Sequence, residues 1–499
     1  MSSERVLVVG AGPVGLTLAC ELARRGTPFR LIDRAPAPTD QSRAIVVHAR
    51  SLEMLDTMGA VDAVIAAAAR MDRIFAHAGG DELARIELGD VDSPYPFTAS
   101  LAQTETERVL RERLTALGGA VERPVELTGL DQDESGVSAR LGDGDERYGW
   151  VVGCDGARSG VRAALDTKLE GSFKGERFLL ADVEADYTQD RSGLHIYFDP
   201  AGPFMLFPMP GSRIRIIAQL DENALTDAEP VVDDVQAMAD ARGEGIRVSG
   251  AHWIAVFEVH HGQVEAYRHG RVFLAGDAAH IHSPAGGQGM NTGMQDAFNL
   301  AWKLDLAARG RATEALLDSY DAERHPVAAR VIKGSTALTR AGTVRNPVAQ
   351  ELRNHAAGLV SHIGPIHRRA AAETEETGIA YPDSPIVANA GRRTPRGAPG
   401  AGDHAPSVLG LHERLRGTSH VALALGGPAA AAAANELAAA FPGLVEPLAL
   451  DEPAVAERYG VEGQDALFVI RPDGYVAFRS APADVEAARA CLERVLTPA

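Results

Sequence analysis

The chain has few cysteines and no excess of basic residues. Only Cys20, Cys154 and Cys491 occur in 499 residues, which is too few and too scattered for a disulfide framework or a cysteine-based metal site. We therefore expect a reducing, cytoplasmic environment. Lys and Arg total 49 against 68 Asp and Glu, a formal net charge of −19. Because that sign repels nucleic acid and anionic membrane surfaces, the sequence predicts neither as a partner.

Long apolar runs are also missing. Val6 to Ala19 contains three glycines and a proline in a patterned array, and glycines and a proline interrupt the alanine-rich segment from Val421 to Phe441. A membrane-spanning helix needs about 20 mainly apolar residues, so no span is predicted. The hydrophobic fraction is nevertheless 45%. A chain of this length and composition is expected to form two or three globular domains.

Catalytic arrays that act without a cofactor are lacking as well. His280 and His282 form an HxH pair, but no third ligand stands at a suitable spacing, so no metal site is predicted. No Ser/His/Asp array is evident. A disulfide reductase would need a second GxGxxG array and reactive cysteines, and the sequence contains only one complete array.

That array stands in the context that a dinucleotide-binding site requires. The β-branched segment Arg5 to Val9 predicts a strand, Gly10-Ala11-Gly12-Pro13-Val14-Gly15 follows, and a helical pattern then ends at Gly26. The next predicted strand, Phe29 to Ile32, ends at Asp33, where an acid can accept hydrogen bonds from an adenosine ribose. Such an acid repels a 2′-phosphate, so FAD or NAD is favoured over NADP. A structural glycine turn is the alternative.

A second strand, glycine loop and helix are predicted between Gly270 and Leu304. An apolar run ends at Gly276-Asp277, and Gln288 to Lys303 has apolar residues at helical spacing. Between them lies Pro284-Ala285-Gly286-Gly287-Gln288-Gly289-Met290-Asn291. Glycines allow a backbone to approach a flat or anionic ligand, and a helix start carries positive partial charge. A plain glycine turn is again the alternative.

Two further regions have distinct patterns. From about Leu179 to Val259 the sequence is rich in predicted strands, whose Phe and Met side chains are core residues by default but could line a pocket for a flat apolar ligand. Gly391 to Pro406 is rich in Gly, Pro and Arg and indicates a boundary. The residues after it predict a small α/β unit that resembles a thioredoxin-like domain without a CxxC motif, and therefore without that fold's redox function.

Three motifs together carry a family resemblance: the glycine array at Gly10 to Gly15, CDGARSGVR at Cys154 to Arg162, and GDAAHIHSPAGGQGMN at Gly276 to Asn291. In this order they resemble the class A FAD-dependent aromatic hydroxylases of the para-hydroxybenzoate hydroxylase type. The C-terminal unit and the wording GRVFLAGDAAH are similar to the branch that hydroxylates aromatic polyketides. The resemblance covers essentially the whole chain.

The resemblance implies an α/β fold, α+β overall. It comprises a Rossmann-like FAD-binding domain, an inserted mixed β-sheet substrate domain and a C-terminal thioredoxin-like domain. The expected boundaries are 1–76, 100–176 and 271–340 for the discontinuous FAD-binding domain, 77–99 and 177–270 for the substrate-binding domain, 341–396 for a helical linker and 397–499 for the thioredoxin-like domain.

The resemblance also implies roles for individual residues. The glycine array would hold the FAD pyrophosphate, Asp33 the adenosine ribose, Arg43 the phosphates and Asp277 a ribityl hydroxyl. Asp155 and Arg162 belong to a motif linked with both FAD and nicotinamide binding. The full implied cofactor set is Gly10, Gly12, Pro13, Gly15, Asp33, Arg34, Arg43, Gln103, Asp155, Asp277, Pro284, Gly287, Gly289, Met290 and Asn291.

Four of these, Pro284, Gly287, Met290 and Asn291, would flank the flavin, which itself performs the chemistry. The implied substrate pocket contains Phe204, Phe207, Pro208, Pro284, Ala285 and Gly286. Two positions depart from the family pattern. Asp33 replaces the usual Glu, which shortens the reach, and Gly262 replaces an Arg, which puts a substrate or nicotinamide contact there in doubt.

The implied activity is that of a FAD-dependent monooxygenase. It would consume NADPH or NADH and molecular oxygen and hydroxylate a polycyclic aromatic, polyketide-type substrate through a C4a-hydroperoxyflavin. A Baeyer–Villiger or epoxidising oxygenase on the same fold is an alternative, and a FAD-binding protein without turnover is another. The expected partner is a small aromatic molecule, and the chain would be a monomer or a homodimer.

Overall fold

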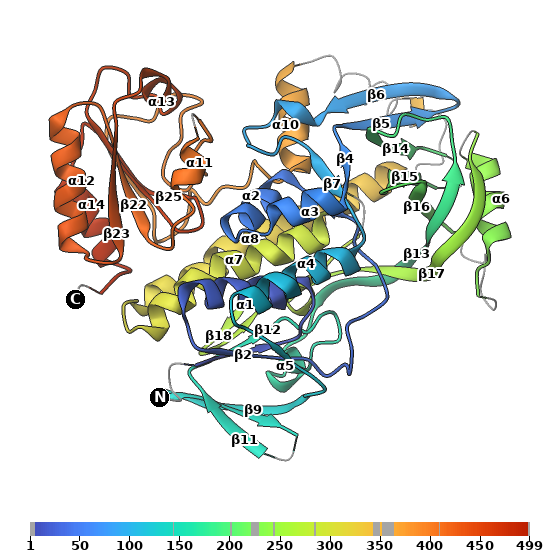
Figure 1. Ribbon diagram of the computed structural model, residues 1–499, viewed down its shortest axis with the longest axis horizontal. Helices are drawn as coiled ribbons and strands as arrows, with labels where there is room; N and C mark the ends of the chain where they lie inside the picture. The colour runs from blue at the N-terminus through green and yellow to red at the C-terminus, as the bar shows by residue number, and fades with distance from the viewer. Residues whose placement is uncertain are drawn as a thin grey trace.

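A computed structural model describes residues 5–142, 144–199, 202–220, 229–242, 245–283, 286–342, 350–351, 364–408 and 410–497, without the side chains of 173–175 and 338–342. Three sheet regions surround a central group of helices, and the C-terminal unit (orange to red) lies to one side (Figure 1). Residues 343–349 and 352–363 of the predicted linker 341–396 lie outside the described residues. Within the described part of the chain, no helix is long and apolar enough to cross a membrane.

The first sheet has six strands in the order β18-β19-β12-β1-β2-β8. β1 (Val6–Val9) lies between β12 (Trp150–Gly153) and β2 (Phe29–Ile32), and both pair with it in parallel. β19 (Val272–Leu274), β8 (Val121–Glu122) and β18 (Arg268–His269) complete the sheet. All four residues of β1 are buried, as a parallel strand covered on both faces requires.

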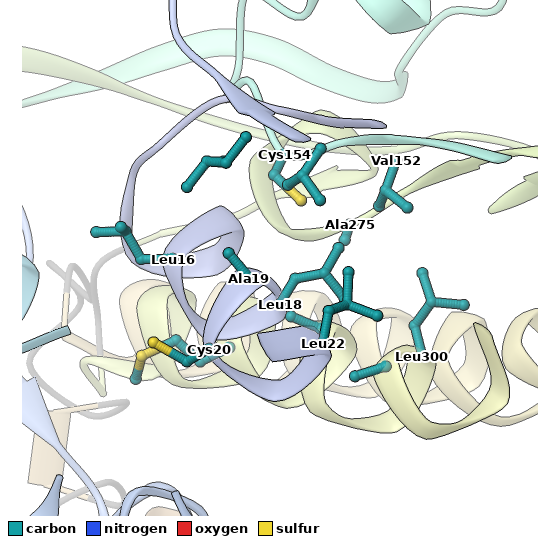
Figure 2. Close-up of a cluster of buried hydrophobic side chains, with 14 of the residues drawn as sticks. Leu16, Leu18, Ala19, Cys20, Leu22, Val152, Cys154, Ala275 and Leu300 are labelled. Atoms are coloured by element: carbon teal, nitrogen blue, oxygen red, sulfur yellow. The ribbon is translucent and has the colours of Figure 1, made fainter. Parts of the chain in front are cut away.

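Helices cover one face of this sheet and a small antiparallel sheet lies on the other side. α1 (Pro13–Arg25) packs against α7 (Gln288–Ala308) and α4 (Gln103–Ala116). Figure 2 shows Leu16, Ala19 and Leu22 of α1 within one apolar cluster that reaches the sheet and α7. The opposite side holds α5 (Gly160–Ala164) and the sheet of β9 (Leu127–Asp133), β10 (Gly136–Leu141) and β11 (Gly144–Tyr148).

The second large sheet is mixed and has eight strands in the order β20-β17-β13-β16-β15-β14-β5-β6. Pairing is antiparallel except between β14 and β5. The bounds are β5 Arg73–Ala78, β6 Asp81–Glu87, β13 Glu170–Asp186, β14 Gly193–Tyr197, β15 Phe204–Pro208, β16 Arg213–Gln219, β17 Arg247–Gln263 and β20 His280–Ile281. β5 begins before residue 77, where the sequence divides the domains, and that division stays a prediction.

The two faces of the eight-stranded sheet have different neighbours. Phe204 and Leu206 of β15 pack in the cluster that includes α6 (Val232–Arg242), whereas Met205 and Phe207 pack in the cluster on the other face. Successive side chains of a strand point to opposite faces, so this split follows from the strand geometry. The face that carries Met205 and Phe207 packs against Ile45, Val46 and Met71, outside the long strands of this sheet.

A short three-stranded sheet, β3-β7-β4, connects the two large sheets. Its strands are β3 (Val46–Val47), β7 (Thr98–Ser100) and β4 (Ala69–Met71). In the chain, α2 (Ala49–Thr57) and α3 (Val61–Ala67) lie between β3 and β4, and the 3-10 turn η2 (Leu88–Asp90) lies between β6 and β7. β3 contacts the start of α7. This small sheet therefore brings residues 46–48 and 98–100 to the end of α7 where the glycine loop lies.

The C-terminal unit has a five-stranded sheet in the order β21-β25-β24-β22-β23. Its strands are β21 (Ala388–Gly391), β22 (His420–Leu425), β23 (Val445–Leu450), β24 (Ala466–Ile470) and β25 (Val476–Ala481), and its helices are α11 (Leu411–Arg414), α12 (Pro428–Ala440), α13 (Pro453–Arg458) and α14 (Val485–Glu493). Separate apolar clusters cover the two faces of the sheet.

This unit shares its core with α7 and α8 (Glu314–Gly342), and α10 (Gly364–Thr374) follows later in the chain. Trp302 of α7 lies in the apolar cluster of the C-terminal sheet. The β24–β25 turn places Arg471 and Asp473 against both helices, where Arg471 Nη1 donates to Glu323 Oε1 at 2.6 Å and Lys303 donates to Glu323 Oε2 at 2.8 Å. All four side chains are almost wholly buried.

Opposite charges within this buried group compensate one another. Burial alone would raise the pKa of Glu323, but Arg471 and Lys303 hold that pKa far below its usual value. Asp473 Oδ2 accepts hydrogen bonds from Trp302 at 3.1 Å and Asn299 at 3.2 Å. Buried ions are tolerated only when paired in this way, so removal of one partner would be strongly destabilising.

Candidate functional site

The three motifs found in the sequence meet at one place. Gly10 has φ +101°, and a β-carbon there would lie 2.5 Å from the carbonyl oxygen of Cys154. A β-carbon at Gly15 would lie 1.8 Å from the carbonyl oxygen of Gly10. The third motif joins them because a β-carbon at Gly276 would lie 2.8 Å from Val14 Cγ2. Glycine is therefore required by backbone approach, and the motifs form one structural unit.

The start of α1 is open. Gly12 is its N-cap residue, no side chain caps it, and the first turn holds no acid. Apart from its neighbours in the chain, no described residue has an atom within 4 Å of the point that a β-carbon of Gly12 would occupy. Asp33 accepts hydrogen bonds from the amides of Ala11 and Ala35, each at 2.8 Å, and so fixes the loop. Empty space before an uncapped helix start fits an anionic pyrophosphate.

Buried side chains hold the backbone of the segment that carries Arg43. Arg215 is fully buried and donates to the carbonyl oxygens of Arg43 and Ala44, each at 3.1 Å, while Asp182 pairs with it at 2.8 Å. Gln103 Oε1 accepts from the amide of Ala44 at 3.0 Å. The side chains of Arg34 and Arg43 are exposed. Gln103 thus anchors the loop, and Arg43 is left free to meet a ligand.

The CDGARSGVR motif stabilises the start of α5 and connects it to the loop of Asp277. Asp155 accepts hydrogen bonds from Ser159 Oγ at 2.5 Å and from the amide of Gly160 at 2.7 Å, which caps α5. Arg162 Nη1 donates to the carbonyl oxygen of Ala278 at 2.9 Å and so connects this motif to the loop of Asp277. Burial lowers the pKa of Arg162, although Asp155 and Asp277 oppose that effect.

Asp277 belongs to the 3-10 turn η3 (Gly276–Ala278) and is exposed to solvent. The surrounding protein nevertheless raises the pKa of its carboxyl, which His280, Arg43 and Arg162 partly offset. The two observations agree if the carboxyl opens into a recess lined by protein, where solvent reaches it but screens it incompletely. Such a position suits a carboxylate that accepts hydrogen bonds from hydroxyl groups of a ligand.

Asp296 of α7 holds the turn that carries Asp277. Its carboxylate accepts from the amide of Gly276 at 3.1 Å and from Arg324 Nε at 2.6 Å, and His280 Nε2 lies 2.8 Å away. Burial raises the pKa of Asp296, but Arg324 and His280 outweigh it and lower the value. His280 is thus a loop-ordering residue. Within the described residues no group of three His, Cys, Asp or Glu side chains could hold a metal.

The start of α7 is also uncapped by side chains. Gly287 is its N-cap residue with φ +67°, and a β-carbon there would lie 2.2 Å from Val46 Cγ2. Asn291 accepts from the amide of His48 at 3.0 Å and donates to the carbonyl oxygens of Gly287 and Val46. The Asn291 side chain therefore ties α7 to β3, and only the backbone amides at the helix start are left for a ligand.

The remaining residues of the glycine loop are either packed against the protein or outside the described residues. Met290 is buried, and a β-carbon at Gly289 would meet only His282, at 3.5 Å. His282 Nε2 is buried and has no hydrogen-bond partner among the described residues. Burial lowers the pKa of His282 to about 4. Pro284, predicted for both the flavin and the substrate, and Ala285, predicted for the substrate pocket, lie outside the described residues.

An apolar cavity lies beside the start of α7, between β3 and the inner face of the eight-stranded sheet. The space between its walls is about 1020 Å³, part of it open to solvent. The sheet supplies mainly apolar side chains together with Arg73 of β5, whereas His48, Thr98, Ser283 and Gly286 line the end near α7. The mainly apolar lining, with polar groups near the start of α7, suits an apolar aromatic molecule that a few polar groups orient.

The predicted pocket residues divide between the two faces of β15. Phe207 and Gly286 line the cavity. Phe204 packs on the opposite face with α6, and Pro208 is not part of the lining. Met205 was among the Phe and Met side chains that the sequence offered as possible pocket residues, and alternation with Phe207 selects it. Sequence reasoning missed His48 and Thr98 altogether. The signal for His48 was a histidine directly after the apolar run Ala44 to Val47.

Residues 3–335 match the family model described as the FAD binding domain. The chain belongs to this family. A 6-methylpretetramide 4-monooxygenase of Streptomyces rimosus is 40% identical over 399 residues, which is 78% of this chain and 72% of that relative. The anhydrotetracycline hydroxylase OxyS of the same species has a similar structure, with a TM-score of 0.78, 30% identity and coverage of 99% of this chain and 100% of that one.

A structure of aklavinone-11 hydroxylase with FAD and aklavinone is likewise similar, with a TM-score of 0.76, 28% identity and 98% coverage of both chains. Together with the family match, these similar proteins confirm the predicted α/β fold and the resemblance to aromatic hydroxylases. The protein is a FAD-dependent monooxygenase that acts on an aromatic substrate and uses reduced nicotinamide and molecular oxygen.

Proposed function

We propose that the protein hydroxylates a polycyclic aromatic substrate of the polyketide type in the cavity beside α7. The observation that carries this proposal is the position of the cavity. Apolar side chains of β14 and β15, among them Ile196, Met205 and Phe207, form one wall, and Gly286 at the start of α7 forms the opposite end. A flat apolar molecule between them would lie next to a flavin at the uncapped helix start.

The residues around the three motifs fit FAD. Gly10, Gly12, Pro13 and Gly15 would hold the pyrophosphate in the empty space before α1, and Asp33 would bind the adenosine ribose. The remaining proposed contacts come from Arg34, Arg43, Gln103, Asp155, Asp277, Gly287, Gly289, Met290 and Asn291, together with Pro284. FAD supplies electron transfer and activation of oxygen when bound.

The protein contributes orientation, charge stabilisation and exclusion of water. The backbone amides at the start of α7, where the N-cap residue makes no side-chain hydrogen bond, would stabilise negative charge on the flavin ring. Asp277 would fix the ribityl chain against that helix. The apolar wall would keep water from the reacting atoms and so favour product over peroxide release.

We further propose a cytoplasmic protein that is a monomer or homodimer and binds neither nucleic acid nor membranes. The net charge of −19 supports the exclusion of polyanions. Three free, buried cysteines support a reducing compartment. Size-exclusion chromatography with light scattering would measure the oligomeric state.

Isotopic labelling tests the proposed reaction. Polycyclic phenols and quinones would be screened for stimulated NADPH or NADH oxidation, and the product would be analysed by mass spectrometry after turnover under ¹⁸O₂. We expect one labelled oxygen in the product, none from labelled water, and an intact carbon ring by NMR. Ring expansion would indicate a Baeyer–Villiger reaction. Peroxide alone with every substrate tried would refute the monooxygenase assignment of this cavity.

The variant Asp277→Ala tests the placement of the flavin. It should bind FAD more weakly and release more peroxide per NAD(P)H oxidised, because the ribityl chain would no longer be fixed against α7. Flavin fluorescence in the filtrate and peroxide yield would measure the two effects. Unchanged retention and coupling in this variant would contradict the proposed contact.

A further inference from the structure

A chain of three hydrogen bonds connects the start of α7 to a buried acid. His48 Nε2 lies 3.0 Å from the carbonyl oxygen of Gly286, and His48 Nδ1 lies 3.2 Å from Thr98 Oγ1. Thr98 Oγ1 is in turn hydrogen-bonded to Glu375 Oε1. His48 and Thr98 line the substrate cavity, while the Glu375 side chain is fully buried. The chain therefore runs from the cavity wall into the protein interior.

The number of protons in this chain is fixed by its geometry. Each of the three hydrogen bonds needs one proton, and a carbonyl oxygen can only accept, so His48 Nε2 must carry one. A neutral His48 and the Thr98 hydroxyl supply two protons in total. An ionised Glu375 supplies none, which leaves one bond without a proton. All three bonds form only when the His48–Glu375 pair holds one additional proton, whichever group carries it.

We propose that His48, Thr98 and Glu375 are positioning residues that hold the Gly286–Gly287 start of α7 through one shared, removable proton. Loss of that proton turns the Thr98 hydroxyl toward the carboxylate, since hydrogen bonds to charged acceptors are stronger. Two lone pairs then face each other, either between His48 and Thr98 or, after a change of tautomer, between His48 and Gly286. In both cases Gly286 is no longer tied to Glu375.

The electrostatic surroundings agree with the proton count. Burial raises the pKa of Glu375 to about 7 and lowers the pKa of His48 to about 4. The amide of Ala49 donates to Glu375 Oε2 at 2.6 Å and occupies its second oxygen. When the shared proton is present, it therefore resides on Glu375 and not on His48, and it is lost as the pH rises through the neutral range.

Other charged groups nearby are bound elsewhere. Glu376 is hydrogen-bonded to Thr292 at 3.0 Å, and Gln295 also donates to it. Arg324 pairs with Asp296, and the guanidinium of Arg50 pairs with Glu53 and donates to the carbonyl oxygen of Thr377 at 3.2 Å. Glu376 adjoins Glu375 in the chain, but its carboxylate is hydrogen-bonded to Thr292 and Gln295 and not to Thr98 or His48, so it provides a matched control.

Nitrogen NMR of histidine-labelled protein tests the proposal directly. The ring signals of His48, assigned by their absence in His48→Gln, would be followed in the FAD-bound protein between about pH 6 and pH 9. We expect them to shift near neutral pH in the wild type and in Glu376→Gln. Glu375→Gln should remove the shift, because its amide donates to Thr98 at every pH. A shift that persists in Glu375→Gln, or no shift in the wild type, would overturn the proposal.

Flavin release gives the functional readout. In the wild type we expect FAD to dissociate roughly three to ten times faster at the alkaline end than at the acid end, the effect of losing one buried hydrogen bond. Glu375→Gln should make the ratio close to one. Thr98→Val should release FAD fast throughout, and Thr98→Ser should restore the pH dependence. A pH-independent wild-type rate would contradict the role in positioning.

This inference rests on the proposed function only for its consequence at the flavin. Failure of the oxygen-labelling experiment would leave the His48 titration unaffected. Conversely, ring signals of His48 that do not shift with pH would refute the proton-dependent contact, but they would leave the source of the oxygen in the product undecided. The two experiments thus fail independently.

Discussion

The chain builds the same helix start twice, once in each half. β1 leads through Gly10 and Gly12-Pro13 into α1, and β22 leads through Gly426 and Gly427-Pro428 into α12. The first glycine has φ +101° in one case and +106° in the other. The N-cap residues Gly12 and Gly427 have φ, ψ of −79°, −173° and −83°, −169°, and neither helix has a side-chain cap. The two N-cap backbones are thus nearly identical, although Ala11 separates Gly10 from Gly12 whereas Gly426 directly precedes Gly427.

The space in front of the two helices differs. Apart from its neighbours in the chain, no described residue has an atom within 4 Å of the β position of Gly12, whereas Asp465 Oδ1 lies 3.2 Å from that of Gly427 and accepts from its amide at 2.5 Å. Three residues after the N-cap, the first helix has Gly15, whereas the second has Ala430 at the corresponding position. A glycine–proline helix start is therefore not a site by itself. A ligand site differs from a structural turn in two ways. The space beside the N-cap glycine is free, and the helix backbone packs closely against the preceding loop at Gly15.

Gly15→Ala should produce the largest effect. Its β-carbon would lie 1.8 Å from a backbone oxygen, so α1 must move away from β1. We expect loss of FAD and destabilisation by at least about 1–3 kcal/mol. Flavin absorbance after gel filtration and denaturant unfolding would measure both. Ala430→Gly is the mirror control and should cost about 1 kcal/mol while FAD stays bound. Equal loss of FAD in both variants would break the comparison.

Asp33→Ala compared with Asp465→Ala is the next test. Asp33→Ala should weaken FAD binding by about 1.5–3 kcal/mol, because charge-assisted hydrogen bonds to the ribose are removed. Asp465→Ala should lower the free energy of unfolding and leave FAD retention unchanged, because that acid serves only its own helix start. Full yellow colour of dialysed Asp33→Ala would count against the cofactor site.

The pH dependence of stability extends the comparison to α7, the other open helix start. Burial raises the pKa of Glu376 from 4.5 to about 8, so its contribution to stability is complete below pH 4.5 and is lost as pH rises through 8. Glu376→Gln should therefore flatten this loss, which is on the order of a few kcal/mol. Unfolding curves at acid and alkaline pH would measure it, and a parallel decline in both proteins would contradict the assignment.

Cys491→Ser should have the smallest effect. Cys491 is buried and is the only cysteine of the C-terminal unit. Because a redox role needs a partner thiol, we expect turnover and the rate of flavin reduction to remain as in the wild type. Stopped-flow reduction by NADPH would check this. A large fall in that rate would show that the C-terminal unit takes part in electron transfer.

Local patterns predicted most of the fold and part of the site. The strands around Val8 and Phe273 and the glycine array depend on neighbouring residues, so their spacing could be read directly. Phe204 was assigned to the pocket because composition does not say which face of a strand meets the cavity. The register of β15 against its neighbours decides that, and it is set by pairing across the sheet.

The rest of the site depends on residues that are distant in sequence. Arg215 supports the Arg43 loop across 172 residues, and Thr98 meets Glu375 across 277. No periodicity or motif links such partners. Their pairing is a consequence of how the small sheet and the end of α10 pack near α7. The roles assigned to the cofactor contacts, including Pro284 outside the described residues, remain predictions.

The turn at Arg471 to Asp473 has a consequence for how the protein is made. It arrives late in synthesis, yet it supplies the guanidinium that neutralises Glu323 and the carboxylate that receives Trp302. Until the ribosome has released it, α7 and α8 must keep those groups hydrated. Glu323 and Trp302 therefore obtain their buried partners only after the C-terminal unit has been translated. A chain that lacked this unit would leave both side chains without those partners.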